Sequence, residues 1–475
     1  MNRLYLTSIL TLLLTDIVSA AIPGRTDETF PLYGNQKTLV ILAEFDGTPF
    51  NVDDAYVYFN GMLTQDDFSD YFCKGSCQQY FRENSNGLFE PQFDVYGPVL
   101  LPKKASYYGA NINNIYDTYA HEMVIDACNI LDDDIDFSLY DTNDDGVVDN
   151  VFIVYAGYGE SSGGGADTVW PHAAYISKKM TESVILDGVI LDRYACVNEM
   201  EKDYPTGIGT FCHEFSHVLG LPDIYPTDQS NNYATGRWDV MDHGSLNGNQ
   251  RRPCNLTSYE RSVFGWLEPE EIVPGQTYTL PPLYENKAFI LRTSSPTEFF
   301  FIENRQLQGW DKSLPGHGLL IWHIDYQEDK WADNTLNNDP SHLCVQVLKA
   351  DGIGSESSEA GDTFPGSTGK YELSRDILPE FSTWDGNGLG IVIKDIAENS
   401  DKSVTFRVEA DDSSVTSTAI DTIVIENRTI SSPLPFTVTD ISGRVIASEL
   451  CRVDLPAPGV YIVRTQDTTK KILVK

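Results

Sequence analysis

The sequence predicts an α+β domain, then an all-β domain, and then a small β-sandwich at the C-terminal end. Three observations predict this order. Apolar strands and helical patterns are mixed in residues 37–268, whereas short apolar strands separated by turn residues fill residues 269–409. A linker rich in Ser, Thr and Asp at 410–421 precedes a β-patterned unit at 422–475. A chain of 475 residues is also too long for one ordinary core, so several domains are expected.

Residues 1–20 are expected to be a secretory signal peptide, followed by a short extension at 21–36. Arg3 gives this segment a basic start, an apolar stretch follows, and small residues end it at Ala20. A buried N-terminal helix is the alternative. No other segment approaches the roughly 20 apolar residues of a membrane-spanning helix. We therefore expect a protein without a transmembrane segment, secreted or attached to the outer cell surface.

The acidic composition limits the classes of partner. The formal net charge of −37 repels phosphate backbones and argues against nucleic-acid binding. It suits a protein that holds hard cations such as calcium, although solubility alone explains most of these carboxylates. Export permits disulfides, but eight cysteines are too sparse for a disulfide scaffold, and the sequence does not predict their pairing.

The elements of the first domain follow from its apolar patterns. The short apolar runs at 37–46 and 150–159 predict buried strands. Helical patterning occurs at 66–84 and again at 114–131. Apolar residues three and four apart also predict a helix at 211–220.

The helix at 211–220 carries the pattern His-Glu-x-x-His. His213 and His217 are four apart, so they lie on one helix face and can offer two imidazole nitrogens to one ion. Glu214 stands beside that face, where a base can take a proton from a metal-bound water. The pattern is typical of zinc peptidases. An ordinary amphipathic helix end that happens to contain histidine is the alternative.

A catalytic zinc needs a third protein ligand, and the next residues offer one. Gly220 can end the helix in a left-handed turn. Asp223 follows six residues after His217, the spacing at which metzincin peptidases carry their third ligand, usually a histidine. A simple turn residue is the alternative for this aspartate. Glu260, on a more distant helix, is the alternative ligand, but it would leave Gly220 and Asp223 without a role.

A methionine turn is the second mark of this kind of domain. Met241, in the turn-rich stretch 236–245, can lie beneath the zinc, although an ordinary core methionine would fit the same pattern. His243 occupies the position at which some metzincins carry a tyrosine, and it either donates to the oxyanion or caps a turn. Together these features predict a metzincin-like zincin fold for the catalytic domain.

A second ion site is predicted in the run DTNDDGVVDN at 141–150. Gly146 stands at the sharp turn of a calcium loop, and Phe152 replaces the glutamate that would complete an EF-hand. An acidic turn without an ion is the alternative. The expected oxygen ligands of a structural calcium are Asp141, Asn143, Asp145, Asp149 and the carbonyl group of Val147.

The predicted function is that of a secreted zinc-dependent endopeptidase. Zinc lowers the pKa of its bound water to about 7, Glu214 takes the proton, and the hydroxide attacks a peptide carbonyl group. Glu214 then returns the proton to the leaving amine. The alternative is a non-catalytic surface binding protein or adhesin built on a peptidase shell, against which the intact Glu214 argues. Expected partners are protein or peptide substrates, without a predicted cleavage preference.

Several motifs occur in one order: DTNDDGVVDNVFIVYAGYGE, DTVWPHA, HEFSHVLGLPDIY, WDVMDHGSLNG and LTSYERSVFGWLEP. Over roughly residues 37–410 the chain resembles the immune inhibitor A-like family of secreted bacterial metalloproteases. The resemblance implies zinc at His213, His217 and Asp223, with Glu214 as base, and it supports calcium. Trp170 and His172 also match a family motif. Many family members carry a long propeptide, whereas only the extension at 21–36 precedes the first strand here.

The C-terminal unit resembles the sorting domain of bacterial type IX secretion cargo. The matching pieces are DISGRVI, LPAPGVYIV and the final KKILVK, all within residues 435–475. This resemblance implies that the secretion machinery is a partner and that the protein crosses the outer membrane. A small β-sandwich accessory module is the alternative.

Overall fold

We analysed a computed structural model of the chain. It describes residues 21–228, 230, 232–411, 424–426, 429–440, 444–455, 457, 459–464 and 469–474. The expected signal peptide and nearly all of the expected linker lie outside these residues. Within them, no helix is long and apolar enough to cross a membrane.

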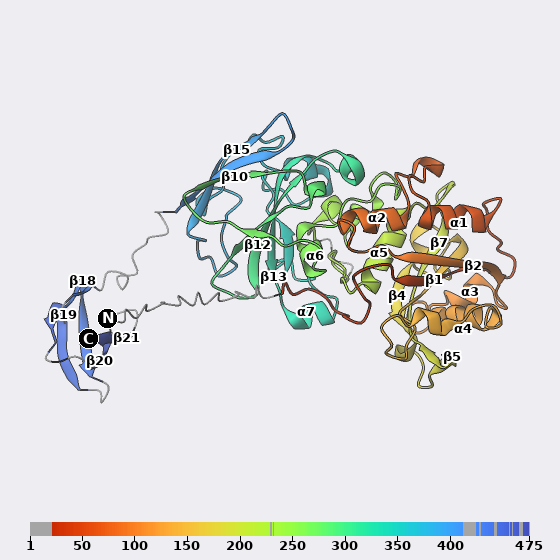
Figure 1. Cartoon of the computed structure of the whole chain (residues 1–475), viewed down its shortest axis with the longest axis horizontal. Coiled ribbons are helices and arrows are strands. Elements are labelled where there is room, and N and C mark those ends of the chain that lie inside the picture. Colours follow the sequence, from red (N-terminus) through yellow and green to blue (C-terminus); the bar gives the residue numbers. More distant parts are fainter. Residues whose placement is uncertain are drawn as a thin grey trace, which may run out of the picture.

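The centre of the first domain is a mixed sheet (Figure 1). Its strands in spatial order are β2 (Gln92–Leu100), β1 (Lys37–Glu44), β3 (Val151–Tyr158), β7 (Arg193–Glu201) and β4 (His172–Tyr175). Neighbours are parallel except β4, which runs antiparallel to β7 and ends the sheet. The short strand β8 (Tyr204–Pro205) also pairs with β7. The buried strands expected at 37–46 and 150–159 are β1 and β3.

Helices cover both faces of this sheet because β1 and β3 carry apolar residues on both faces. Val40 and Phe152 face a core shared with α1 (Ala55–Thr64), α2 (Cys77–Asn84) and α5 (Ile208–Val218). Leu39 and Ile153 face a second core on the other side. That core contains α3 (Ala105–Tyr108) and α4 (Ala120–Ile130), and the hairpin of β5 (Val184–Leu186) and β6 (Val189–Leu191) packs there too.

Two helices are shorter than the sequence pattern predicts. The pattern at 66–84 yields a helix only from Cys77, because the Ser76 side chain caps it by accepting a hydrogen bond from the Gln79 amide. The pattern at 114–131 yields a helix only from Ala120, since Asn114 and Asp117 have positive φ angles of 63° and 47°. A left-handed backbone cannot continue a right-handed helix.

The β-rich segment expected at 269–409 forms two sheets (Figure 1). The larger has the order β14 (Val345–Val347), β13 (Gly318–Asp325), β12 (Glu298–Arg305), β11 (Phe289–Arg292) and β9 (Glu270–Glu271). The smaller has the order β10 (Gln276–Leu280), β16 (Val404–Ala410) and β15 (Ile391–Glu398). Two short helices, α6 (Ser258–Val263) and α7 (Glu328–Ala332), lie before and within this segment.

The expected boundary after residue 268 does not separate two cores. Strand β12 is apolar on both faces, so Phe299 and Phe301 pack into the core of α5, while Phe300 and Ile302 pack into the core of the smaller sheet. The junction also buries charges, because Arg305 donates to both Glu303 and Asp311 at 2.9 Å. The amide of Ser258, at the start of α6, donates to Glu303 at 2.7 Å. The β-rich segment therefore shares a core with the first domain.

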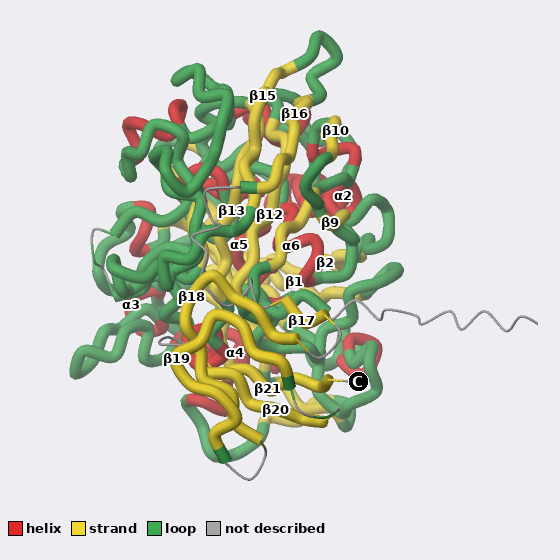
Figure 2. Tube along the Cα trace, turned by 90° about the vertical axis from the view of Figure 1, so that its left-hand side faces the viewer, coloured by secondary structure: helices red, strands yellow, loops and turns green. Residues whose placement is uncertain are grey.

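The C-terminal unit has a core of its own, which includes Phe436, Val438 and Val463. Its described strands form one five-stranded sheet, seen from the side in Figure 2. They are β17 (Val424–Glu426), β18 (Thr429–Asp440), β19 (Val445–Asp454), β20 (Gly459–Arg464) and β21 (Thr469–Val474). Its β pattern agrees with the sequence prediction.

Candidate metal centre

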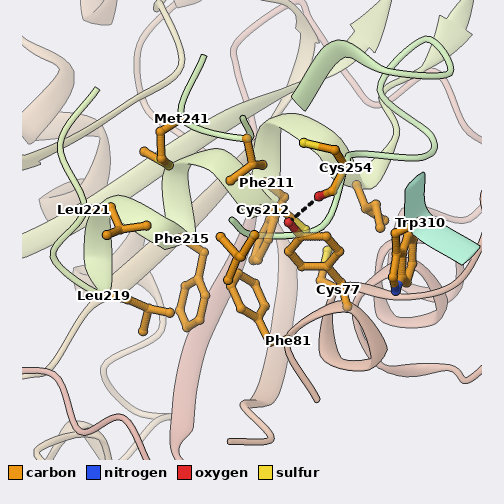
Figure 3. Close-up of a cluster of buried hydrophobic side chains, with 14 of the residues drawn as sticks. Cys77, Phe81, Phe211, Cys212, Phe215, Leu219, Leu221, Met241, Cys254 and Trp310 are labelled. Carbon is orange, nitrogen blue, oxygen red and sulfur yellow. Dashed lines mark hydrogen bonds between the residues drawn. The ribbon is translucent and has the colours of Figure 1, made fainter. Parts of the chain in front are cut away.

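Helix α5 packs one face into the core and turns the other towards a cleft. Phe211, Cys212 and Phe215 are buried beside Met241 and Trp310 (Figure 3). Cys212, directly before the first histidine, is a buried packing residue. Its thiol hydrogen-bonds that of Cys77 on α2, and the seven cysteines whose side chains are described are all free. This packing fixes the direction in which the opposite face points.

Gly220 lets the chain reverse directly after α5. Its φ of +99° lies in the left-handed region, where a side chain is strained. A Cβ atom at this position would also come within 2.3 Å of the carbonyl oxygen of Asp27. The N-terminal extension lies against this turn, since the Thr26 amide donates to the Gly220 carbonyl at 2.8 Å. The turn carries Asp223 back towards the histidines.

Both histidines are oriented by backbone carbonyl groups. The Nδ1 atom of His213 lies 2.8 Å from the carbonyl oxygen of Val240, and that of His217 lies 2.7 Å from the carbonyl oxygen of Leu221. A carbonyl oxygen can only accept, so each Nδ1 carries the proton and each Nε2 presents a lone pair in the neutral ring. This is the arrangement that metal-binding histidines require.

Asp223 completes a compact set of three ligand atoms. Its Oδ1 lies 3.2 Å from Nε2 of His213 and 3.2 Å from Nε2 of His217. Two ligand atoms of a tetrahedral zinc, each about 2.0–2.1 Å from the ion, lie about 3.3 Å apart. All three side chains are largely buried, and Oδ1 has no hydrogen-bond partner. The spacing and the chemistry of these donors fit a zinc ion.

The pKa shifts of His217 and Asp223 also indicate that these groups favour a positive charge between them. Burial lowers the pKa of His217, but Asp223 and Glu214 oppose this and raise it to about 9. Burial raises the pKa of Asp223, but the two histidines hold it below its ordinary value. In the metal-free protein, a proton between the histidines and Asp223 therefore takes the place of the cation.

Glu214 lies beside this set without taking part in it. It is buried, and one of its oxygens, Oε2, has no hydrogen-bond partner. One of its carboxylate oxygens lies within 4.8 Å of a ring nitrogen of His213 and of a ring nitrogen of His217. Burial raises its pKa, although the charges of His213 and His217 act to lower it. A carboxylate of this kind readily accepts a proton.

These residues line a cleft of about 690 Å³. Strand β4 forms one wall, and Trp170 and His172 both belong to the lining. His172 is fixed in place, since its Nδ1 lies 2.6 Å from the Trp170 carbonyl oxygen and its Nε2 lies 2.9 Å from the Tyr194 hydroxyl group. The two residues that matched a motif without a derived role thus form part of the cleft wall.

Two lining residues were missed by the sequence analysis. The ring of Tyr225 stacks against His213, with centroids 6.2 Å apart and an interplanar angle of 22°. Asn334, just after α7, donates to Oδ2 of Asp223 at 2.7 Å and accepts from the Asp223 amide at 2.8 Å. The sequence offers a signal for Tyr225, because this aromatic residue stands only two positions after Asp223. Asn334 has no local signal, because it lies 111 residues further along the chain.

The stretch that contains Met241 lies against the loop that follows α5 and against His213. Met241 is fully buried, and its carbonyl oxygen accepts from the Ile224 amide at 2.9 Å. The Met241 amide in turn donates to Asp239 at 2.8 Å. Glu260, the alternative third ligand, lies behind this turn, where it is buried and hydrogen-bonded to Asp239 and Thr257. The structure does not bring Glu260 to the histidines.

Glu260 raises the cost of ionising the buried carboxyl group of Asp239, and this predicts a pH dependence of stability. Burial and the neighbouring Glu260 carboxylate raise the pKa of Asp239 well above its ordinary value. The folded state therefore keeps a proton that the unfolded state loses above about pH 4, so stability falls as pH rises by up to about 1.4 kcal/mol per pH unit. Asp239→Asn can donate a hydrogen bond to Glu260 without titrating. We expect its unfolding free energy in urea to fall less between pH 6 and pH 9 than that of the wild type. Equal slopes would contradict the raised pKa of Asp239.

His243 is not part of the cleft. Its side chain is about half exposed, and the nearest carboxylate is that of Asp242, at 3.9 Å. It is absent from the residues that line the cleft. Its amide is held by the Asp242 side chain at 2.8 Å, which fixes the start of a short turn. The side chain that caps this turn is that of Asp242, so the structure shows neither of the two roles considered for His243, and its role stays a prediction.

The predicted calcium loop is closed by its own acidic residues. The side chain of Asp141 accepts from the amides of Asp145 and Gly146 at 2.9 and 2.8 Å. Asp149 is buried and its Oδ1 has no hydrogen-bond partner. Burial and the charges of Asp141 and Asp145 raise the pKa of Asp149 to about 6. A cation would relieve both the unpartnered oxygen and the crowding of charge.

Residues 35–267 match the family described as immune inhibitor A peptidase M6, catalytic domain. The pre-pro-metalloprotease PrtV of Vibrio cholerae serotype O1 is 30% identical over an alignment of 234 residues that covers 42% of this chain and 25% of that protein. Immune inhibitor A of Bacillus thuringiensis subsp. alesti is 27% identical over an alignment of 231 residues that covers 41% of this chain and 33% of that protein. The matches thus span a quarter to a third of the relatives' length. They confirm the resemblance for the catalytic segment and do not extend to the C-terminal unit.

Proposed function

We propose, from the match of residues 35–267 to metallopeptidase catalytic domains, that this protein is a zinc-dependent endopeptidase. One observation carries the proposal: Oδ1 of Asp223 lies 3.2 Å from the Nε2 atoms of both His213 and His217, with the unpartnered oxygen of Glu214 beside them. A non-catalytic binding protein would have no need of a buried carboxylate held open to the cleft. We therefore favour the enzyme over the adhesin alternative.

His213, His217 and Asp223 would hold the metal. Zinc bound there supplies a Lewis acid that polarises a carbonyl group and lowers the pKa of water. Glu214 takes the proton of the attacking water on its free carboxylate oxygen and delivers it to the leaving amine, and burial raises its pKa towards the working pH for this purpose. Tyr225 stacks on His213, so it helps to hold that ring in place.

The substrate is an extended polypeptide. Strand β4 pairs with β7 on one side only, and it lines the cleft beside the histidines. Its free edge presents backbone donors and acceptors with which an extended chain can pair. Backbone pairing recognises a peptide chain without regard to its side chains. We propose protein and peptide substrates on this ground.

Removal of the metal tests the proposed function. A strong zinc chelator is expected to abolish cleavage of an unfolded, fluorescently labelled protein, and zinc added back in equimolar amount is expected to restore it. Metal analysis of the purified protein should find one zinc per chain at this site. Cleavage that continues at full rate in the metal-free protein would rule out the proposal.

We propose that the loop 141–149 binds a structural calcium ion, held by Asp141, Asn143, Asp145, Asp149 and the Val147 carbonyl group. Millimolar calcium is expected to raise the thermal midpoint by a few degrees, because a ligand that binds only the folded state stabilises it. Asp149→Asn removes one ligand charge and should abolish the shift. Asp133→Asn, at an exposed position outside the loop, should leave it intact. If calcium does not raise the wild-type midpoint, the loop is an acidic turn without an ion.

We further propose that the protein is exported by the signal peptide at 1–20 and that the unit at 422–475 directs type IX sorting, with the secretion machinery as partner. The sequence motifs alone support this part of the proposal. The names of the relatives, one of them a pre-pro-metalloprotease, are consistent with secretion.

A further inference from the structure

A second pocket of about 710 Å³ adjoins the cleft. Glu201, Leu246 and Gln250 line both spaces, so the second pocket continues the first at the end of β7. It is formed by the turn at 70–73 together with the loops at 201–206 and 246–251. Its volume falls within the range of pockets that bind small ligands or side chains.

The mouth of this pocket is rimmed by exposed aromatic residues. Phe72 is 89% exposed, Tyr204 is 52% exposed and Tyr71 is 44% exposed. Large apolar side chains gathered at one exposed place mark a site of interaction more often than chance exposure does. Here they surround a hollow that opens into the cleft.

The turn that presents two of these aromatic residues is strained. Tyr71 and Phe72 have φ angles of 50° and 71°, in the left-handed region that bulky residues rarely adopt. Such strain costs on the order of 1–3 kcal/mol per residue and persists where the surrounding structure enforces it. A turn that held these rings only for packing would have no reason to leave Phe72 in solvent.

The surrounding loops hold this turn rigidly. The amide of Cys73 donates to the backbone carbonyl oxygen of Asp70 at 3.1 Å. The amide of Lys74 donates to the backbone carbonyl oxygen of Arg251 at 3.1 Å. The Arg251 guanidinium group lies 5.5 Å from the centre of the Tyr204 ring and donates to the Pro205 carbonyl at 2.9 Å. The aromatic rim is therefore arranged before any ligand binds, which lowers the entropic cost of binding.

The charges of the pocket differ from those of the whole protein. Lys202 and Arg251 line it beside one acidic residue, Glu201, although the formal net charge of the chain is −37. A third basic lining residue, Arg237, is paired with Glu356 at 2.7 Å and does not add to this local charge. The local field therefore favours an anionic group next to an apolar one.

We infer that this pocket is an extended subsite of the cleft, which takes an aromatic or long aliphatic substrate side chain with an acidic residue beside it. The inference rests on the proposed peptidase function. The substrate is the occupant because the pocket and the cleft are continuous, so one extended chain can lie in both. The subsite lies at one end of β7, so the preference applies to a position several residues from the scissile bond and on one side of it only.

Cleavage of a peptide library by the zinc-loaded enzyme tests the subsite. The wild type is expected to favour aromatic residues at one distant position, by roughly tenfold in kcat/KM over alanine. Phe72→Ala and Tyr204→Ala should each reduce that preference several-fold. Tyr371→Ala, at an exposed tyrosine outside the pocket, is the matched control and should keep it. A library profile that is identical in the wild type and both pocket variants would overturn the inference.

Binding separates this inference from the proposed chemistry. The affinity of one long aromatic peptide is measured by fluorescence anisotropy for the Glu214→Gln protein and for its double variant with Phe72→Ala. We expect binding to weaken about tenfold in the double variant. This result would support the subsite even if the wild type cleaved nothing, which would defeat only the proposed peptidase function. Equal affinities of the two proteins would overturn the subsite.

Discussion

Replacing Glu214 by glutamine is expected to lower kcat by about a thousandfold while leaving the metal in place. Glutamine has nearly the same size and shape, but it cannot take a proton from water. General-base catalysis contributes roughly 10²- to 10⁴-fold to such reactions, so the loss lies within that range. Glu214 is not among the atoms that close the 3.2 Å contacts around Asp223, so the ligand set does not depend on it.

The measurement is single-turnover cleavage of a fluorogenic peptide, with zinc content determined on the same samples. Glu182→Gln is the matched control, because it removes one exposed carboxylate outside the cleft. It should retain wild-type kcat and zinc content. A Glu214→Gln protein that keeps its full zinc content and more than a tenth of wild-type kcat would show that another group serves as the base.

The parts of the site that follow local spacing could be predicted from the sequence. His213 and His217 share a helix face because they are four apart, and the left-handed Gly220 returns the chain so that Asp223 meets both histidines. The acidic loop at 141–149 is equally local. In each case one short stretch of backbone determines the geometry, so its residue spacing carries the information.

The remaining parts depend on contacts between distant segments. Asn334 reaches Asp223 from 111 residues away, and nothing in the sequence near either residue indicates the contact. The packing across the boundary expected after residue 268 depends on such contacts as well. The change from mixed to β-rich patterning is real, but β12 is apolar on both faces and joins the core of α5. Sequence periodicity shows which residues are buried and does not show against which element.

His243 lies outside the cleft, and its position also depends on a contact that spacing alone does not show. Its place two residues after Met241 suggested a catalytic role, by analogy with a tyrosine in other peptidases. The Asp242 side chain instead holds the His243 amide in a turn, and the imidazole lies in solvent.

The β-rich segment supplies the residues that hold the third ligand. Asn334 binds both the amide and the carboxylate of Asp223, at 2.8 and 2.7 Å. Asn337 donates to the carbonyl group of Ile224 at 2.7 Å, and Asn338 accepts from the Thr227 amide at 2.8 Å. Three asparagines of one short run therefore fix the loop that follows α5. The matched catalytic segment ends at residue 267, before this run begins.

Asn334→Gly is expected to weaken zinc affinity by about 10- to 100-fold, the usual cost of removing a group that orients a metal ligand. Glycine is the right replacement because Asn334 has a φ of 54°, which alanine would adopt only with strain. Without the amide, Oδ2 of Asp223 loses its donor, and the carboxylate is free to rotate away from the histidines. Zinc affinity is measured by competition with a chromophoric chelator, which does not depend on activity.

Asn338→Ala is the control for this effect, because it weakens the same loop without touching Asp223. Its zinc affinity should stay within about threefold of the wild type. Asn334→Asp adds a sharper comparison, since it keeps the shape of the side chain but places a second carboxylate against Asp223, and it should bind zinc no better than Asn334→Gly. If Asn334→Gly and Asn338→Ala weaken zinc binding equally, the loop as a whole supports the site. A larger loss in Asn334→Gly alone would instead assign the positioning of Asp223 to Asn334, and would make the β-rich segment part of the metal centre.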